Sequence, residues 1–494
     1  MHRRDFLRSG AALAAAPAFL RGASDPSAPN ILLLMADQYR ADCLGASGNG
    51  FIHTPNLDRL ARNGIYFRNA WSSTPTCTPA RAALLTGMSP WNHGMLGYGT
   101  VAEHYPVEMP RQLRDAGYYT SGIGKMHWHP QRATHGFDQI LLDESGRVES
   151  PDFRSDYRSW FLSEEPVANP DATGIDWNSN EASPYQLPER LHPTTWIGDT
   201  AVRFLQDYRK PQPFFLKVSF ERPHSPYDPP QRWWDRYDTP LPAAQTGAWA
   251  GKFRARSGND STIWHGDIGA EATARARRGY YGSVSFVDEQ VGRIIEALDR
   301  RGWLSNTIIV FLADHGDMLG DHFLWRKSYA YQGSARIPMI VHWPQGIAAS
   351  GVRDQPVEIR DVLPTLLDAA RITAPKEMDG SSLLSIARDP KAQWRQWIDL
   401  EHDVCYSAEN HWSALTDGKT KYIFHAMTGQ EQFFDLETDP HELNDLAGSP
   451  EIPEWRDRLA SHLTPRGPAW VKDGKLQLRP KSQLYSPNYP AKGQ

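Results

Sequence analysis

One of the chain's three cysteines, Cys77, stands in the polar segment TPTCTPARAALLTG, residues 74–87, with Arg81 four positions later. A nearby cation and the start of a helix both lower the pKa of a thiol, so this spacing first suggests a thiolate nucleophile. His127 or His224 would then act as its base. An isolated cysteine is more often a small buried core residue, but the prolines and threonines on both sides of Cys77 argue against simple core packing.

Two apolar runs each end in a pair of polar side chains. The run ILLLM leads to Asp37 and Gln38, and the run IIVFL leads to Asp314 and His315. Both runs have the character of buried parallel strands, and ligands gather beyond the carboxyl ends of such strands. A hard divalent cation needs several oxygen donors brought together, so the two pairs predict a metal site. The alternative is that these acids cap helices or pair with arginine.

Three further segments carry basic side chains that could act in catalysis. GIGKMHWHP contains Lys125, His127 and His129, RPHSPY contains His224, and LWRKSYAYQG contains Lys327. Alternate residues of an extended chain point the same way, so His127 and His129 could be half of a zinc site. They could also be a satisfied surface pair, which is the commoner outcome, and a lone histidine or lysine in a loop is more often simply solvated.

The elements that must position these residues alternate between strands and helices, which predicts an α/β domain with a largely parallel sheet. Residues 213–220 form a further candidate strand, and residues 284–301 have apolar side chains at helical spacing. Residues 143–195 and 227–280 are expected to be long insertions over the sheet. After about residue 375 the pattern favours a smaller α+β unit with an antiparallel sheet, followed by an irregular tail over residues 466–494.

The composition is that of a globular protein with a sizeable core, with 494 residues, 40% hydrophobic and 22% charged. A net charge of −5 argues against a nucleic-acid binder that relies on a basic surface. Residues 1–23 have paired arginines, a short apolar run and small residues, which predicts a twin-arginine-type signal and an exported, periplasmic or extracellular protein. No later stretch is long and apolar enough to predict a membrane helix. The three cysteines form no disulfide framework.

Two segments together resemble the signatures of one known family. PTCTPARAALLTG is similar to the first signature of the type I sulfatases, and GYYTSGIGKMH, residues 117–127, is similar to the second. The resemblance implies an alkaline phosphatase-like fold, in which helices sandwich a large mixed, mostly parallel sheet and a smaller C-terminal α+β subdomain is built on an antiparallel sheet. It implies a catalytic domain over residues 24–375 and a C-terminal subdomain and tail over residues 376–494.

The resemblance also implies a modified residue and a metal. A formylglycine-generating enzyme would read the Cys-x-Pro-x-Arg stretch and convert Cys77 to formylglycine, an aldehyde. The modified side chain would bind one divalent cation together with Asp37, Gln38, Asp314 and His315. Ca²⁺ is the expected ion, with Mg²⁺ and Mn²⁺ as alternatives.

The remaining residues are assigned by the same resemblance. Arg81 would steady the modified residue, Lys125 and Lys327 would hold sulfate oxygens, and His127 and His224 would transfer protons. The implied reaction is hydrolysis of a sulfate ester to an alcohol and inorganic sulfate.

The sequence departs from the commonest family pattern at two metal ligands. Gln38 stands where a second aspartate is frequent, and His315 where asparagine is frequent, so the negative charge of the site is lower. This leaves open a phosphonate monoester or phosphodiester hydrolase of the same superfamily. A non-catalytic binding protein is a third possibility if Cys77 stays unmodified.

The motifs do not specify the natural substrate or the oligomeric state. A sulfated carbohydrate or an aryl sulfate is expected, because aromatic side chains at a pocket rim suit sugar rings, although most tryptophans lie in protein cores. Several of the 18 tryptophans fall in or near the predicted insertions: Trp160, Trp177, Trp196, Trp233, Trp234, Trp249 and Trp264.

Overall fold

A computed structural model describes residues 28–144, 147, 149–407 and 410–490 of the chain. Its centre is an eight-stranded sheet with the strand order β5-β4-β6-β1-β7-β8-β2-β9. These strands are β1 (Asn30–Asp37), β2 (Ile65–Phe67), β4 (Tyr119–Gly124), β5 (Gln139–Leu142), β6 (Phe214–Pro223), β7 (Thr307–Ala313), β8 (Met339–His342) and β9 (Gly351–Arg353). The short strands β3 (Ala70–Trp71) and β10 (Val357–Glu358) pair with each other.

The five strands from β5 to β7 run parallel to their neighbours, whereas β8 pairs antiparallel with both β7 and β2. The sheet is therefore mixed and mostly parallel, as expected from the sequence. β1 lies between β6 and β7, and every residue of β1 after Asn30 is buried. A strand covered on both faces must be almost wholly apolar, which explains the uninterrupted run ILLLM.

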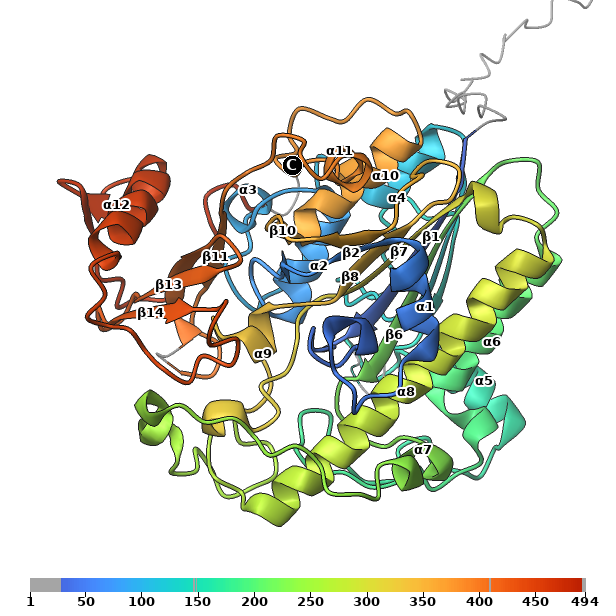
Figure 1. Cartoon of the computed structure of the whole chain (residues 1–494). Helices are drawn as coiled ribbons and strands as arrows, with labels where there is room; N and C mark the ends of the chain where they lie inside the picture. The colour runs from blue at the N-terminus through green and yellow to red at the C-terminus, as the bar shows by residue number, and fades with distance from the viewer. Residues whose placement is uncertain (1–27, 145–146, 148, 408–409, 491–494) are drawn as a thin grey trace, which may run out of the picture.

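Helices cover both faces of the sheet (Figure 1). On one side lie α1 (Pro55–Asn63), α6 (Pro193–Asp207) and α8 (Ala270–Arg300), and on the other α2 (Cys77–Thr86), α4 (Met109–Asp115) and α10 (Val362–Ala369). Shorter helices are α3 (Pro90–His93), α5 (Asp156–Glu164), α7 (Gln231–Arg236), α9 (Gln332–Ala335) and α11 (Leu384–Arg388). Residues 227–280, predicted as an insertion over the sheet, extend too far at their end, because α8 begins at Ala270 and includes the last part of that stretch.

The C-terminal part contains a second, four-stranded antiparallel sheet in the order β11-β12-β13-β14. Its strands are β11 (Ile398–His402), β12 (Trp412–Thr416), β13 (Thr420–His425) and β14 (Glu431–Asp435), and α12 (Ile452–Leu463) packs against β12 and β13. Figure 1 shows this unit in orange and red beside the main sheet. The predicted antiparallel subdomain is therefore present.

The predicted domain limits stay a prediction. Leu383 and Leu384, beyond residue 375, still pack in the core of the large sheet. The tail was expected to lack regular structure, but it contains a small hairpin of β15 (Val471–Lys472) and β16 (Lys475–Leu476). The predicted signal segment, residues 1–23, lies outside the described residues.

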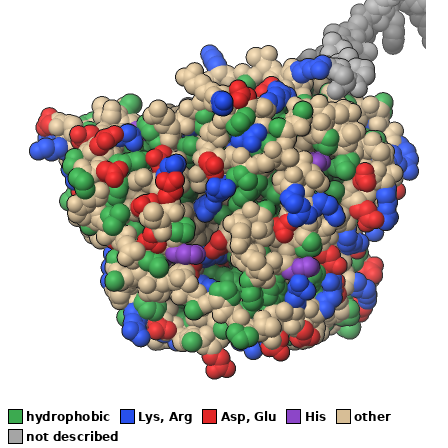
Figure 2. Space-filling model, in the orientation of Figure 1, with side chains coloured by type: hydrophobic (Ala, Val, Ile, Leu, Met, Phe, Trp, Pro, Cys, Tyr) green, Lys and Arg blue, Asp and Glu red, His purple; other side chains and the backbone are tan. Residues whose placement is uncertain are grey.

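Within the described part of the chain, no helix has both the length and the apolar character needed to cross a bilayer. Acidic and basic side chains are interspersed over the face shown in Figure 2. This mixture agrees with the small net charge of the sequence.

Candidate active site

The carboxyl ends of four adjacent parallel strands deliver the predicted residues to one edge of the sheet. Asp37 is the last residue of β1, and Asp314 directly follows β7. Lys125 directly follows β4, and His224 directly follows β6. All four side chains are buried, so their charges and hydrogen bonds act in a medium of low polarity.

Cys77 is the first residue of α2, whose amino terminus points at the same edge. Its Sγ lies 3.2 Å from Nε2 of His315 and 3.8 Å from Oδ1 of Asp37. Burial and Asp37 raise the pKa of the thiol, but Lys327, Lys125 and His315 outweigh them and bring that pKa down to about 7. Residue 77 therefore sits among the predicted metal ligands rather than in the apolar core.

Four buried side chains form a group that could hold a metal ion. Asp37, Cys77, Asp314 and His315 each offer one ligand atom, and these atoms all lie within 4.8 Å of one another. Two carboxylates and an imidazole nitrogen are donors that suit a divalent cation. The donor set therefore fits a divalent cation.

Gln38 adds a carbonyl oxygen beside this group. Its backbone N–H donates to Oδ1 of Asp314 at 3.0 Å, and its Nε2 donates to Oδ2 of Asp317 at 2.6 Å. The other end of the amide, Oε1, accepts a hydrogen bond from Nζ of Lys327 at 2.8 Å. Asp317 was missed as a site residue, although it belongs to the same ADHGD segment as Asp314.

Arg81 bridges the two carboxylates that end β1 and β7. Its Nε lies 2.9 Å from Oδ2 of Asp314, its Nη2 lies 3.2 Å from Oδ2 of Asp37, and its Nη1 donates to the Lys125 carbonyl at 2.7 Å. The ammonium of Lys125 also forms an ion pair with Asp37. Burial alone would raise the pKa of Asp37, but Lys125, His224 and Arg81 hold it well below its usual value.

His224 and Lys327 are hydrogen-bonded to each other in the same site. Nζ of Lys327 lies 2.7 Å from Nε2 of His224, and Nδ1 of His224 lies 2.8 Å from the Ser225 carbonyl oxygen. The indole of Trp177 stacks on the His224 ring, with centroids 4.6 Å apart, and lies 5.0 Å from Nζ of Lys125. Burial, with Lys327 and Lys125, lowers the pKa of His224 well below its usual value.

His127 is held by a residue that the sequence did not indicate. Its backbone N–H donates to Oε1 of Glu144 at 2.8 Å, and Oε2 of Glu144 accepts from Arg147 at 2.7 Å. The imidazole lies 6.0 Å from the ring of Tyr98. Burial, with the positive charges of Arg147 and other nearby cations, lowers the pKa of His127 well below its usual value.

His127 and His129 do not form a zinc site with any third ligand among the described residues. In that part of the chain, the group of Asp37, Cys77, Asp314 and His315 is the one cluster of at least three candidate ligands. The side chain of His129 is half exposed, and its Nδ1 lies 3.7 Å from Oε2 of Glu149.

The seven tryptophans in or near the predicted insertions differ in their surroundings. Trp196 and Trp234 are buried in the core, as most tryptophans are. Trp177, from the insertion at residues 143–195, contacts the site through His224 and Lys125. The others are partly exposed: Trp160, Trp233, Trp249 and Trp264.

A mostly parallel α/β sheet with buried carboxylates and imidazoles at its strand ends, and a cysteine at the start of a helix beside them, is the architecture of the alkaline phosphatase-like hydrolases. The chain belongs to the sulfatase family within this superfamily. The family model described as "Sulfatase" matches residues 29–372. A second model, described as "N-sulphoglucosamine sulphohydrolase, C-terminal", matches residues 320–466.

Individual relatives agree with this assignment. The chain is 41% identical over 456 residues to an arylsulfatase of Clostridium perfringens, covering 88% of this chain and 93% of the relative. It is 32% identical over 460 residues to a choline-sulfatase of Rhizobium meliloti, covering 88% and 86%. The structure superposes on a phosphonate monoester hydrolase of Agrobacterium radiobacter with a TM-score of 0.73 and 26% identity, covering 88% and 95%.

Proposed function

We propose that this sulfatase hydrolyses the sulfate ester of a carbohydrate or an aryl alcohol, with residue 77 acting as its nucleophile after conversion to formylglycine. The observation that carries the proposal is the position of Cys77 Sγ, 3.2 Å from Nε2 of His315 and 3.8 Å from Oδ1 of Asp37. An aldehyde hydrate at this position would contact the predicted metal ligands. A formylglycine-generating enzyme would act on the chain before it folds.

Asp37, Gln38, Asp314 and His315 would hold one divalent cation together with residue 77. Two carboxylates and an amide oxygen favour a hard ion, for which Ca²⁺ is our proposal over Mg²⁺ and Mn²⁺. A bound cation would supply Lewis acidity to the nucleophile and offset the charge on the ester oxygens.

The chain's own residues account for binding of the ester. Lys125 and Lys327 offer ammonium groups to the sulfate oxygens, and Arg81 fixes the two metal-binding carboxylates by its paired contacts. Buried cations of this kind stabilise a transition state strongly, because their charges are fixed in place and little screened. The hydrate of formylglycine offers one hydroxyl to attack sulfur and a second with which to release sulfate.

Proton transfer is assigned to the hydrogen-bonded pair of His224 and Lys327 and to His127. Lys327, hydrogen-bonded to His224, supplies the proton that the leaving alcohol takes up. His127 accepts the proton of the second hydroxyl, which allows the carbonyl to re-form as sulfate departs. The low pKa of His127 agrees with an imidazole that is neutral, as a base must be.

The substrate class rests on Trp177 and on the family relationship. Trp177 presents an aromatic surface at the site, which suits a sugar ring or an aryl group. The phosphonate and phosphodiester alternative is less well supported, because the phosphonate hydrolase is more distant from this chain than the arylsulfatase is.

The test uses 4-nitrophenyl sulfate and a matched aryl phosphonate as substrates for the parent and for Cys77→Ala. The parent should prefer the sulfate, and Cys77→Ala should lose turnover while keeping the melting temperature of the parent. Mass spectrometry of the peptide containing residue 77 should find an aldehyde in place of the thiol. Turnover by Cys77→Ala at the parent rate would contradict the mechanism, and an intact thiol in cells able to modify it would favour the non-catalytic reading.

The cellular location is a further proposal. Residues 1–23 support export by a twin-arginine route to the periplasm or beyond, which is compatible with modification of Cys77 before export. Replacing both Arg3 and Arg4 by lysine should leave the sulfatase in the cytoplasmic fraction. Fractionation followed by immunoblotting measures this, and unchanged export would contradict the proposed route.

A further inference from the structure

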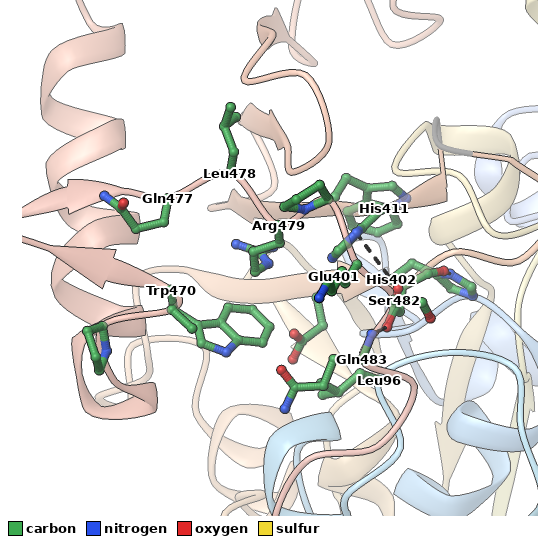
Figure 3. Close-up of a pocket in the computed structure, with 16 residues that line it drawn as sticks. Leu96, Glu401, His402, His411, Trp470, Gln477, Leu478, Arg479, Ser482 and Gln483 are labelled. Carbon is green, nitrogen blue, oxygen red and sulfur yellow. Dashed lines mark hydrogen bonds and ion pairs between the residues drawn. The ribbon is translucent and has the colours of Figure 1, made fainter.

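A cavity of about 450 Å³ lies in the C-terminal part of the protein, and none of the proposed catalytic residues lines it. It is bounded by the ends of β11 and β12, by the tail between residues 468 and 483, and by Leu96. Figure 3 shows the side chain of Arg479 in this pocket, between Trp470 and His411. Volumes of this order are typical of sites for small molecules.

Arg479 is a buried cation in the lining of the cavity, and most of its hydrogen-bonding capacity is unused. The residue is 7% exposed, and its guanidinium lies 4.0 Å from the centroid of the Trp470 ring. Nη2 donates to Oγ of Ser413 at 2.7 Å. Among the residues that the structure describes, neither Nε nor Nη1 has a hydrogen-bond partner. A buried guanidinium with unmet donors is costly, and a bound anion would remove that cost.

The carboxylates around Arg479 are committed to other partners. Both oxygens of Glu401 bind Arg466, at 2.6 and 2.9 Å. The carboxylate of Asp403 accepts the backbone N–H groups of Val404 and Gln483. Burial therefore lowers the pKa of Arg479 to about 10, even though Glu401 opposes the shift.

His411 provides a second unused polar atom in the same cavity. The residue is 4% exposed, and its Nδ1 has no hydrogen-bond partner within the described part of the chain; the nearest carboxylate oxygen, Oδ1 of Asp403, is 3.8 Å away. Burial and the charge of Arg479 lower the pKa of His411 to about 3, so the ring is neutral and its Nδ1 can donate or accept one hydrogen bond. Lys481 lies exposed at the rim and adds positive charge to the entrance.

We propose that this cavity binds a small oxyanion, either inorganic sulfate or a carboxylate or sulfate carried on a single sugar-sized ring, with the anionic group on Nε and Nη1 of Arg479. The forked geometry of a guanidinium matches the oxygens of either group, and such charge-assisted bonds are stronger than neutral ones. The ring would lie against the apolar surfaces of Leu96, Trp412 and Pro480, which also line the cavity.

This second site is separate from the catalytic one, and the inference does not depend on the proposed reaction. His402 lines the cavity, and its Nε2 lies 2.5 Å from Oγ1 of Thr76, the residue before Cys77.

Two sources share the ligand chemistry. One is the inorganic sulfate that a sulfatase releases, and the other is an acidic or sulfated sugar unit next to the one being cleaved.

Crystals of the parent protein soaked in sodium selenate test the site directly. Selenate copies sulfate in shape and charge, and selenium gives an anomalous signal that locates it. We expect an anomalous peak within hydrogen-bonding distance of Nε or Nη1 of Arg479. Peaks confined to the catalytic site or to the surface would overturn the proposal for inorganic sulfate. The proposal would then depend on the binding of glucuronate or glucose 6-sulfate.

Isothermal titration calorimetry with sodium sulfate, glucuronate and glucose 6-sulfate measures binding in solution and separates the two sources. Tighter binding of sulfate would identify the released product as the ligand, and tighter binding of either sugar would identify a sugar unit. Arg479→Gln should weaken the binding of the preferred anion at this site at least tenfold. His411→Asn, which removes the second polar group, should weaken it by a smaller factor.

The matched control is Arg458→Gln. Arg458 also stacks on a tryptophan, Trp455 at 4.7 Å, but it is paired with Glu454 at 2.8 Å. This substitution should leave anion binding unchanged. Equal binding by the parent and by folded Arg479→Gln, or no second binding event for any of the three anions, would overturn the proposal.

Discussion

Lys327 donates a hydrogen bond to His224, with 2.7 Å between Nζ and Nε2. The carbonyl oxygen of Ser225 accepts from Nδ1 of the same ring, at 2.8 Å, so Nδ1 carries the hydrogen and Nε2 the lone pair. The low pKa of His224, caused by burial and then by Lys327, agrees with a neutral imidazole. In the substrate-free protein the proton of this pair therefore lies on Lys327, and the histidine positions it.

This relationship predicts a dependence on the leaving group. Lys327→Gln removes the proton source, so turnover of an unactivated sugar sulfate should fall by about 10²–10⁴-fold. Turnover of 4-nitrophenyl sulfate should fall less, because nitrophenolate leaves without being protonated. The measurement is kcat on both substrates for the variant and the parent.

The control for Lys327→Gln is Lys419→Gln, which removes an exposed lysine paired with Glu437 at 2.9 Å. It should leave kcat on both substrates unchanged. If Lys327→Gln lowered kcat equally on both substrates, Lys327 would act by binding sulfate alone, and the assignment of the proton would be wrong.

Metal binding should be visible as stability. A cation held by Asp37, Asp314 and His315 binds the folded chain, and a concentration one hundred times Kd would add about 2.7 kcal/mol to the free energy of unfolding. Treatment with a chelator should lower the melting temperature, and Ca²⁺ should restore it more effectively than Mg²⁺ or Mn²⁺. Differential scanning fluorimetry measures the shift.

Asp314→Asn should abolish this calcium-dependent shift, because the ligand group loses a charged oxygen. The matched control is Asp368→Asn, which alters an exposed aspartate on α10 that accepts from Ser382 at 2.5 Å. That variant should keep the shift of the parent. A full calcium shift in Asp314→Asn would place the ion elsewhere.

The orientation of the Gln38 amide depends on Asp317. Oδ2 of Asp317 accepts from Nε2 of Gln38 at 2.6 Å and from the hydroxyl of Tyr227 at 2.5 Å. Asp317→Asn weakens this acceptor and should lower metal affinity or activity by about 10–100-fold, the usual effect of removing support from a ligand. Titration of the chelated protein with Ca²⁺ measures the affinity.

Tyr227→Phe is the partner variant for Asp317→Asn, since it removes one donor and leaves the contact with Gln38. Its calcium affinity should fall by a smaller factor. Equal affinities of the parent and of Asp317→Asn would show that Gln38 is not a ligand, or that Asp317 does not orient it.

The sequence predicted those parts of the site that follow from local patterns. The apolar runs that became β1 and β7 are uninterrupted because both strands are covered on both faces, so Asp37 and Asp314 could be placed at strand ends. Cys77 could be placed at the start of a helix by the polar-to-apolar change that follows it. Topology then brought these distant residues together, as the alternation of strands and helices implies.

The supporting residues could not be predicted, because they depend on how long segments fold over the sheet. Glu144 holds the backbone of His127 from just after β5, and no spacing in the sequence connects the two. The beginning of α8 was missed for a similar reason. Its first half lacks a strong apolar pattern and packs closely on another segment at Gly279, where a Cβ would lie 2.5 Å from the Tyr227 carbonyl oxygen.

An ion pair in the C-terminal subdomain should make stability depend on pH. Nε2 of His462 lies 3.2 Å from Oδ2 of Asp399, and Arg466 lies 3.9 Å from the same oxygen. Arg360 lies 3.1 Å from the other oxygen, Oδ1. Burial lowers the pKa of His462, but Asp399 outweighs burial and raises it above the usual value. The charged pair therefore stabilises the fold fully below about pH 6.5, which is the pKa of a histidine in an unfolded chain.

That stabilisation is lost as the pH rises through the raised pKa of His462, where the imidazole becomes neutral. His462→Gln should accordingly lower the melting temperature more at about pH 5.5 than at about pH 9. His104→Gln, at an exposed position, should have the same small effect at both values. Scanning calorimetry of the two variants and the parent measures the difference in melting temperature. If the effect of His462→Gln grew with pH, the neutral ring, and not the ion pair, would stabilise this subdomain.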